Sequence, residues 1–232
     1  MVRSARAFGT QESPPLDHSG EGPETASKKG AFDRLHRELV EHARRLGPID
    51  DEPTGAIDST GFEIRHASLH YLNKRPDTQR FRCPFWPKLT VLCHTRSYLW
   101  VGCHVSYGPS NDAPGFDPTL RQAAELVEWD RILADAAYDS EWSHRLSREV
   151  LGIRSSVIPI NSRGTKKWPP SKYRRQMKRR FWRRIYHQRV HVESSFSMDK
   201  RQLGSFLRSR RENTRFQEVR LRVLVHNLAI LW

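Results

Sequence analysis

The sequence predicts an α/β domain whose sheet begins with antiparallel strands and continues with parallel ones. Two observations carry this prediction. Short apolar and β-branched runs come first, at about residues 55 to 62 and 88 to 106. Beyond residue 118 such runs alternate with stretches of helical periodicity, the pattern of strand–helix–strand units. In open sheets of this kind, functional side chains gather at the carboxyl ends of the strands.

The beginning of the chain differs in composition from the remainder. Residues 1 to 29 are rich in Gly, Ser, Pro and Glu and poor in large apolar residues, so we expect them to be disordered. A short amphipathic helix is predicted from about residue 31 to 46, and Gly47-Pro48 ends it. We therefore divide the chain into residues 1–49, a tail with a short helix, and residues 50–232, a single folded domain.

Strands and helices can be assigned in chain order across the folded domain. The strands are short runs rich in Val, Ile, Leu and Thr, and the helices repeat apolar residues every three to four positions. The predicted elements are a strand at 55–62, two strands within 88–106 joined by a turn at 95–97, a loop at 108–118, a helix at 119–128, a strand at 131–135, a helix at 137–152, a strand at 153–160, a mostly helical basic segment at 171–201 and a closing helix at 213–231.

The charge of the chain restricts its partners. The 40 Lys and Arg residues exceed the 26 Asp and Glu residues, which leaves a net charge of +14. A surplus of this size predicts a polyanionic partner, and nucleic acid is the simplest one. No apolar run approaches the ~20 residues that cross a bilayer, and the N-terminus lacks the apolar core of a signal peptide. We expect no membrane partner and a cytoplasmic, nucleoid-associated location.

A basic segment with interleaved aromatic residues points to DNA. Between Val150 and Val192 there is no acidic residue at all. Cations alternating with aromatic rings suit phosphate contacts combined with base stacking. The alternative is a solvated basic face whose aromatic residues belong to the core. The cations of this segment that we expect to bind DNA include Arg179, Arg180, Arg183 and Arg184.

One carboxylate follows directly on this basic segment. If residues 186 to 200 form a helix, Tyr186, Arg189, Glu193 and Lys200 project at roughly 0°, 300°, 340° and 320°, which is a single face. A carboxylate that faces a polyphosphate is unfavourable unless a metal cation lies between them. Glu193 is therefore a candidate metal ligand. The alternative is an intrahelical ion pair between Glu193 and Arg189 at i,i+4 spacing.

Two aspartates at strand ends could complete such a metal site. Phosphoryl transfer commonly uses Mg²⁺, which takes oxygen ligands, and two ions can hold the attacking and leaving oxygens. Asp58 lies within an apolar strand, where a carboxylate is costly unless it is paired or bound to metal. Asp135 ends the strand at 131–135. Asp139 suits a helix N-cap, which leaves Asp135 as the better ligand, although each aspartate alone also fits an ordinary turn or cap.

Other possible ligands are less convincing. The adjacent Cys–His pairs at 93–94 and 103–104 suggest structural zinc, but neighbours on a strand point to opposite faces. The histidine pairs at 66 and 70 and at 187 and 191 are four residues apart, as helical metal ligands can be. We expect structural or DNA-facing roles for the first pair and place the second pair away from the Glu193 face.

The spacing of Tyr186, Arg189, Glu193 and Lys200 resembles the signature of the DDE transposases of the insertion-sequence four and five groups. The segments AIDSTGF and LADAAYDS, which carry the two aspartates, are similar to the first and second aspartate motifs of that family. The NDAPGF loop and the closing VLVHNLAIL helix are similar to it as well. The resemblance covers about residues 50 to 232, and three motifs in the right order make it specific.

This resemblance implies a ribonuclease-H-like fold in which Asp58, Asp135 and Glu193 form a metal-binding catalytic triad. The implied cofactor is Mg²⁺, for which Mn²⁺ can substitute. The other three residues of the signature would contact transposon-end DNA. The implied reaction is cleavage at transposon ends and strand transfer into target DNA, carried out by a homodimer bound to the terminal inverted repeats.

In one respect the chain departs from the family pattern. Members usually carry a larger helical domain before the first aspartate, and it recognises the terminal repeats, whereas only 57 residues precede Asp58 here. Either the chain is truncated or end recognition resides in the basic segment. A second functional hypothesis is therefore a catalytically inactive, DNA-binding remnant of a transposase. A ribonuclease-H-like nuclease without strand transfer would share the same site.

Overall fold

The computed structural model describes residues 23–64, 86–161 and 168–232, with side chains from residue 30 onward. Helix α1, Pro23–Leu46, begins within the stretch that we expected to be disordered and well before residue 31. The predicted start of this helix, at about residue 31, was therefore too late, while residues 1–22 lie outside the described residues. The predicted histidine pair at 66 and 70 also lies outside them.

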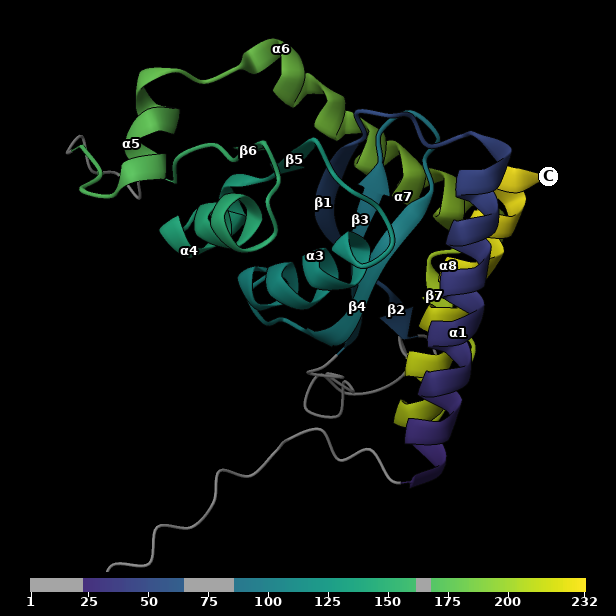
Figure 1. The fold of residues 1–232 in the computed structure, drawn as a ribbon. Coiled ribbons are helices and arrows are strands. Elements are labelled where there is room, and N and C mark those ends of the chain that lie inside the picture. Colours follow the sequence, from purple (N-terminus) through teal and green to yellow (C-terminus); the bar gives the residue numbers. More distant parts are fainter. Residues whose placement is uncertain (1–22, 65–85, 162–167) are drawn as a thin grey trace, which may run out of the picture.

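A five-stranded mixed sheet forms the centre of the molecule (Figure 1), with the strand order β4-β3-β1-β5-β6. Its strands are β1 Thr54–Gly61, β3 Trp86–His94, β4 Trp100–Gly108, β5 Arg131–Ala134 and β6 Ser155–Val157. β1, β3 and β4 pair antiparallel, and β5 and β6 continue parallel to β1. This confirms the predicted α/β class and the ribonuclease-H-like arrangement. A separate two-stranded sheet joins β2, Glu63–Ile64, to β7, Phe206–Leu207.

The helical elements follow the predicted order with shifted boundaries. They are η2 Ala113–Gly115, α3 Phe116–Ala124, η3 Ala136–Tyr138, α4 Glu141–Arg145, η4 Leu146–Val150, α5 Lys172–Arg179, α6 Arg183–Tyr186, η5 His187–Arg189, α7 Val190–Leu203 and α8 Glu212–Leu231. The loop predicted at 108–118 contains η2 and the start of α3, because proline is tolerated in the first turn of a helix. The helix predicted at 137–152 is divided among η3, α4 and the π-turn η4.

Alternation along the strands divides the core between the two faces of the sheet. Ile57 and Leu92 belong to the cluster that includes α3 residues, and Ala56 and Val91 belong to the cluster that includes α7 and α8 residues. Because successive side chains of a strand point to opposite faces, Asp58 shares the face of Ala56. The predicted catalytic aspartate of β1 is thereby directed toward α7.

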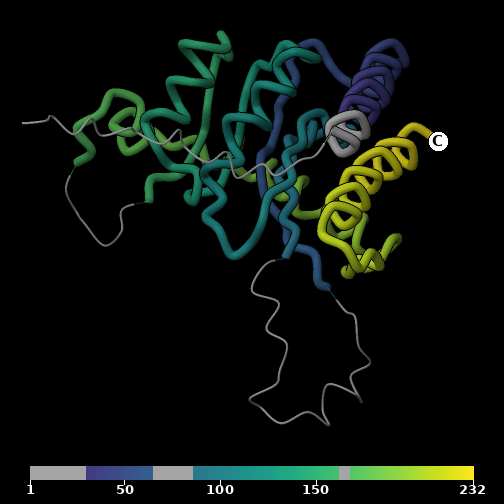
Figure 2. Tube along the Cα trace, turned by 90° about the horizontal axis from the view of Figure 1, so that it is seen from below, coloured from purple at the N-terminus to yellow at the C-terminus, as the bar shows by residue number. Residues whose placement is uncertain are grey.

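Trp100, the first residue of β4, fixes the helices on that side. α1 and α8 lie side by side along the β4 edge of the sheet (Figures 1 and 2). In α8, the His226 ring stacks on Trp100 at 3.8 Å between centroids, and the Asn227 amide pairs with both backbone groups of Trp100 at 2.8 and 2.9 Å. His36 of α1 bonds the same carbonyl, and the indole N–H donates to Ser195 of α7. The helix that carries the predicted glutamate is thus fixed to the sheet.

Candidate active site

The two predicted aspartates lie on neighbouring parallel strands. Ile57 of β1 pairs with Ala134 of β5 in register, so Asp58 and Asp135 come next on the two strands. Parallel neighbours are about 4.8 Å apart, and residues in register point to the same face. The structure therefore brings these two carboxylates together at the carboxyl end of β5, as expected for a site in an open α/β sheet.

The segment that carries the signature residues is not one continuous helix. Tyr186 ends α6, Arg189 lies in the 3₁₀ turn η5, and Glu193 lies in the first turn of α7. A 3₁₀ turn rotates by about 120° per residue rather than ~100°, which changes the projected angles. The single helical face of the prediction is therefore wrong in detail. η5 itself packs against both β1 and β5, next to the two aspartates.

Arg189 links two of the predicted carboxylates. Its Nη1 lies 3.1 Å from Asp58 Oδ2, and its Nη2 pairs with the Glu193 carboxylate four residues along the chain. The guanidinium carbon also lies 5.8 Å from the centre of the Tyr186 ring. The intrahelical pair that we considered as the alternative for Glu193 is therefore present. The structure adds to it a contact with Asp58, 131 positions away.

The carboxylates around Arg189 influence one another electrostatically. The pKa of Asp58 is raised above its usual value, mainly by burial. The Ser59 amide, which donates to Asp58 at 2.9 Å, and Arg189 lower this pKa, whereas the negative charges of Asp135 and Glu193 raise it. Burial also raises the pKa of Asp199, but that residue is directed elsewhere and pairs with Arg222 at 3.5 Å.

Lys200 reaches β1 rather than the carboxylates. Its ammonium donates to Thr60 Oγ1 at 2.6 Å and to the Gly61 carbonyl at 3.0 Å, and it lies 5.6 Å from the Phe62 ring. Burial lowers the pKa of this lysine. Lys200 therefore fixes α7 to the last residues of β1, two and three positions beyond Asp58.

Sequence reasoning missed a hydroxyl cluster on the opposite face of β1. Ser59 Oγ lies 2.7 Å from Thr90 Oγ1 and 2.8 Å from the Tyr138 hydroxyl. Ser59 and Thr90 are register partners in β1 and β3. Since Tyr138 follows Asp135 in η3, this cluster connects the two strands that carry the aspartates. The cluster depends on strand register, which no local sequence pattern reveals.

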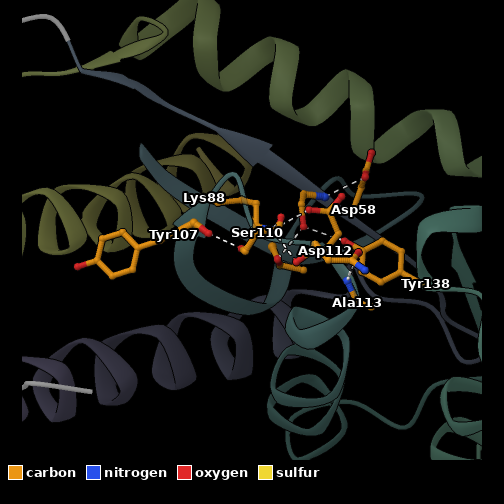
Figure 3. Close-up of polar contacts among 10 residues, drawn as sticks. Asp58, Lys88, Tyr107, Ser110, Asp112, Ala113 and Tyr138 are labelled. Atoms are coloured by element: carbon orange, nitrogen blue, oxygen red, sulfur yellow. Dashed lines mark hydrogen bonds and ion pairs between the residues drawn. The ribbon is translucent and has the colours of Figure 1, made fainter. Parts of the chain in front are cut away.

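Sequence reasoning also missed Lys88, whose ammonium binds the loop from Ser110 to Asp112. Figure 3 shows its buried side chain reaching Ser110 and Asp112, and Tyr138 beyond them, with Asp58 nearby. Lys88 Nζ donates to the carbonyls of Ser110 and Asn111 at 2.7 and 2.9 Å and to Asp112 Oδ1 at 2.8 Å. The resemblance of the NDAPGF loop to the family was the only signal in the sequence for this contact.

The predicted capping roles of the second motif were reversed. Asp135 accepts a hydrogen bond from the Ala136 amide and caps η3, whereas Ser140, not Asp139, caps α4. Asp139 instead forms a two-pronged ion pair with Arg174 of α5 at 2.9 and 2.7 Å. A cap contact and a metal-binding role are compatible for Asp135, because a carboxylate has two oxygens with several lone pairs.

The other predicted DNA-binding cations lie at the surface. Arg179 and Arg180 at the end of α5, and Arg183 and Arg184 in α6, are exposed. They precede Arg189 along the chain, so the basic surface leads toward the carboxylates. This placement suits electrostatic contact with a phosphate backbone.

The donor set suits a hard divalent cation, although its present arrangement does not enclose one. Three carboxylates are typical ligands of Mg²⁺ or Mn²⁺. Burial is the main cause of the raised pKa of Asp58, and the negative charges of Asp135 and Glu193 add to it. Within the described ranges, no three His, Cys, Asp or Glu side chains converge as metal ligands. Arg189 lies between Asp58 and Glu193 and is their cationic partner.

The sulfur and imidazole alternatives are not supported among the described residues. Cys93 is buried in the core, and burial raises the pKa of its thiol to about 12, which keeps it protonated. His94 turns toward Asp50 at 3.3 Å. His191 bonds the Tyr98 hydroxyl at 2.7 Å, away from Glu193.

A comparison with protein families shows to which family the chain belongs. The model of the family described as "Transposase DDE domain" matches residues 50–228. The chain belongs to the DDE transposase family. No curated protein matched the chain. Family membership gives DNA as the partner, and DDE transposases generally use divalent metal ions. Assignment of this DDE domain to the insertion-sequence four and five groups stays a prediction. None of the described helices is long and apolar enough to cross a membrane.

Proposed function

We propose that the chain cleaves DNA at transposon ends and transfers the freed 3′-hydroxyl into target DNA. The observation that supports this most strongly is the contact of Arg189 with both Asp58 and Glu193, with Asp135 next to Asp58 on the neighbouring parallel strand. These carboxylates come from three separate segments, and the chain also belongs to the DDE transposase family. A carboxylate cluster beside a strongly basic surface suits phosphoryl transfer on a polyanion better than simple DNA binding.

Asp58, Asp135 and Glu193 would hold divalent metal, Mg²⁺ with Mn²⁺ able to substitute. When bound, such ions polarise the scissile phosphate and activate the attacking water or hydroxyl. Asp58 would supply its carboxylate from strand β1, and Glu193 would supply its carboxylate from the first turn of helix α7. Asp135 would use the carboxylate oxygen that does not cap η3.

Arg189 would exchange its partners when DNA binds. In the structure its guanidinium contacts two carboxylates, and guanidinium forms equally good two-pronged pairs with phosphate. A phosphate that arrives at the site would draw Arg189 away from Asp58 and leave that carboxylate available. Tyr186, next to Arg189, would pack against the backbone or a base, and Lys200 would position phosphate beyond the end of β1.

We propose a homodimer as the form that engages the two terminal inverted repeats and the target DNA. The side chains of Leu221, Val225 and Leu228 on α8, and of Trp232 directly after it, are exposed at spacings of four, three and four residues. From Leu221 onward every exposed α8 residue is apolar. A stripe with this spacing can pack against a copy of itself. Leu221→Glu/Leu228→Glu should therefore reduce the molar mass measured by light scattering in the presence of duplex DNA, whereas an unchanged mass would exclude this face.

The organisation of the chain follows from this proposal. Residues 50–232 would be the catalytic domain, and residues 1–49 a preceding region whose helix α1 packs against α8. The net charge of +14 would keep the protein on nucleoid DNA in the cytoplasm.

The test is a nicking and strand-transfer assay on supercoiled plasmid that carries candidate element ends. Mg²⁺, Mn²⁺ and EDTA are compared for the wild type, for Asp58→Asn and for Glu193→Gln. Glu38→Gln, an exposed carboxylate on α1, is the matched control. We expect metal-dependent products that disappear in both site variants and persist in the control.

The form of the products separates the alternatives. Joined products identify strand transfer, and nicks alone identify a nuclease that shares the fold. DNA binding without products in any metal would favour the inactive remnant. Retained cleavage by Glu193→Gln would overturn the proposed triad.

A further inference from the structure

The outer surface of α5 forms a basic groove apart from the carboxylate site. The groove has a volume of about 610 Å³. Four cations line it, Lys172, Arg175, Arg179 and Arg180, together with the indole of Trp182. The remaining lining residues are neutral, so no acidic side chain among the described residues faces the groove.

The acidic residues near α5 are all engaged on its inner face. The buried Asp139 carboxylate pairs with Arg174, and the Tyr173 hydroxyl donates to Glu149 at 3.0 Å. Glu141 accepts the backbone N–H groups of Tyr173 and Arg174 at 3.0 and 3.2 Å, which satisfies the first turn of α5. The nearby negative charges are thereby engaged on the inner side of α5. Of the groove cations, Lys172 reaches toward that side, where its ammonium donates to the Tyr173 hydroxyl at 3.3 Å.

The cations of the outer face are arranged in a row. Lys172, Arg175 and Arg179 project at roughly 0°, 300° and 340° around α5, so they share one side of the helix. Arg175 Nε donates to the Pro169 carbonyl at 3.3 Å, and the Arg180 guanidinium lies 5.9 Å from the centre of the Trp182 ring. These contacts restrict two of the four cations before any ligand arrives, which lowers the entropy cost of binding.

The groove is connected to the carboxylate site at both ends of its segment. Asp139, which anchors α5, comes four residues after Asp135. At the other end, α5 continues through α6 to Arg189 (Figure 1). The groove is therefore linked to the carboxylate site through Asp139 on one side and through α6 on the other.

We propose that this groove binds the sugar–phosphate backbone of duplex DNA beside the point of cleavage. A row of cations without acidic neighbours suits consecutive phosphates, and arginine pairs with phosphate in two-pronged geometry. Such contacts fix the position of the duplex and carry no base sequence information. The location relative to cleavage rests on the proposed function, whereas binding of duplex in the groove does not.

The test measures fluorescence anisotropy of a labelled duplex of arbitrary sequence with the full chain across a range of salt concentrations. Lys172→Gln/Arg179→Gln should weaken binding about tenfold for each cation at ~0.1 M salt. It should also make the slope of log affinity against log salt shallower by about 2. Arg34→Gln/Arg45→Gln removes the same charge from exposed positions on α1, at the other end of the molecule (Figures 1 and 2), and should leave the slope nearly unchanged.

Equal losses of duplex affinity in the two double variants would show a general charge effect and would contradict DNA binding in the groove. Unchanged affinity in the α5 variant would contradict it as well. Both α5 positions are exposed, and equal urea midpoints of wild type and variant would confirm that the fold is retained.

The groove and the proposed reaction can fail separately. If plasmid products are absent but the α5 variant shows the shallower slope of log affinity against log salt, DNA binding in the groove is supported and the proposed reaction is contradicted. If the α5 variant forms metal-dependent products and its product yield depends on DNA concentration as in the wild type, DNA binding in the groove is contradicted and the proposed reaction is supported.

Discussion

Arg189 has more charged partners at the candidate site than any other predicted residue. Burial alone would lower the pKa of its guanidinium, but Tyr186, Asp58 and Glu193 together raise it. Its side chain is 17% exposed, so its ion pairs are partly shielded from solvent and stronger than surface pairs. Arg189 therefore competes with any other cation for the same carboxylate oxygens.

The first prediction concerns that competition. Arg189→Met should raise the affinity for Mn²⁺ about tenfold in the absence of DNA, because the variant removes the cation that contacts Asp58 and Glu193. Free Mn²⁺ can be measured by electron paramagnetic resonance or by calorimetric titration. Arg201→Met, an exposed position on α7, is the control and should not change the affinity. Unchanged or weaker binding in Arg189→Met would show that these carboxylates do not bind the ion.

Lys88 supplies the second prediction. Its ammonium has three acceptors in the loop from Ser110 to Asp112, and its side chain is 8% exposed. Lys88→Met would leave buried acceptors unpaired, so we expect a loss of about 2–3 kcal/mol in the free energy of unfolding. Urea denaturation measures this loss. Lys172→Met, at an exposed position, should change the stability by less than about 0.5 kcal/mol. Similar stability of the two variants would contradict this role of Lys88.

At the scale of elements, α5 is attached to the catalytic layer by polar contacts rather than by a large apolar face. Tyr173 and Met177 are its buried residues, and the remaining attachment comes from Arg174, Glu141 and Arg148, whose guanidinium donates to Gln176 at 2.7 Å. Loss of one ionic partner should therefore affect this element more than the sheet.

The third prediction tests this attachment. Arg174→Met removes the cationic partner of the inaccessible Asp139 carboxylate, which should cost about 3–5 kcal/mol and loosen α5. Amide hydrogen exchange should accelerate across residues 172–180 and remain slow in β1. Arg179→Met on the outer face is the control and should leave exchange unchanged. Uniform acceleration through the whole chain would indicate global destabilisation instead.

For the whole molecule, buried histidines determine a response to acid. Burial lowers the pKa of His36, His94, His144 and His226, and for His144 the value falls to about 4. Each binds a proton less readily in the folded chain than in the unfolded one. Stability contributed by these neutral histidines is therefore lost as the pH falls from about 6.5 toward 4. The raised pKa values of Asp58 and Asp199 act in the opposite sense.

The fourth prediction follows from the shift at His144. That residue alone should account for about 3 kcal/mol between neutral pH and its folded-state pKa. Urea unfolding from about pH 7 to about pH 5 at constant ionic strength measures the slope. His144→Gln should flatten the profile, whereas His42→Gln, at an exposed position on α1, should retain it. If the free energy of unfolding depends on pH identically in the two variants, His144 is not the cause of the loss of stability at acidic pH.

The sequence by itself determined the α/β class, the order of the elements and the identity of the signature residues. Strand alternation and helical periodicity are local properties, and they survive folding because each element buries one face. The spacing from Tyr186 to Lys200 is also local, so the resemblance to the family depends on no tertiary contact. Boundaries were less certain, as at α1 and α3, because helix ends depend on capping and packing.

Only the tertiary structure decided which groups meet at the site. The contact of Arg189 with Asp58 joins residues 131 positions apart, and the Ser59–Thr90 contact exists because β1 and β3 pair in that register. Lys88 reaches its loop for the same reason. Such contacts depend on how the chain closes around its core, and a local pattern contains no information about which distant segment supplies the partner.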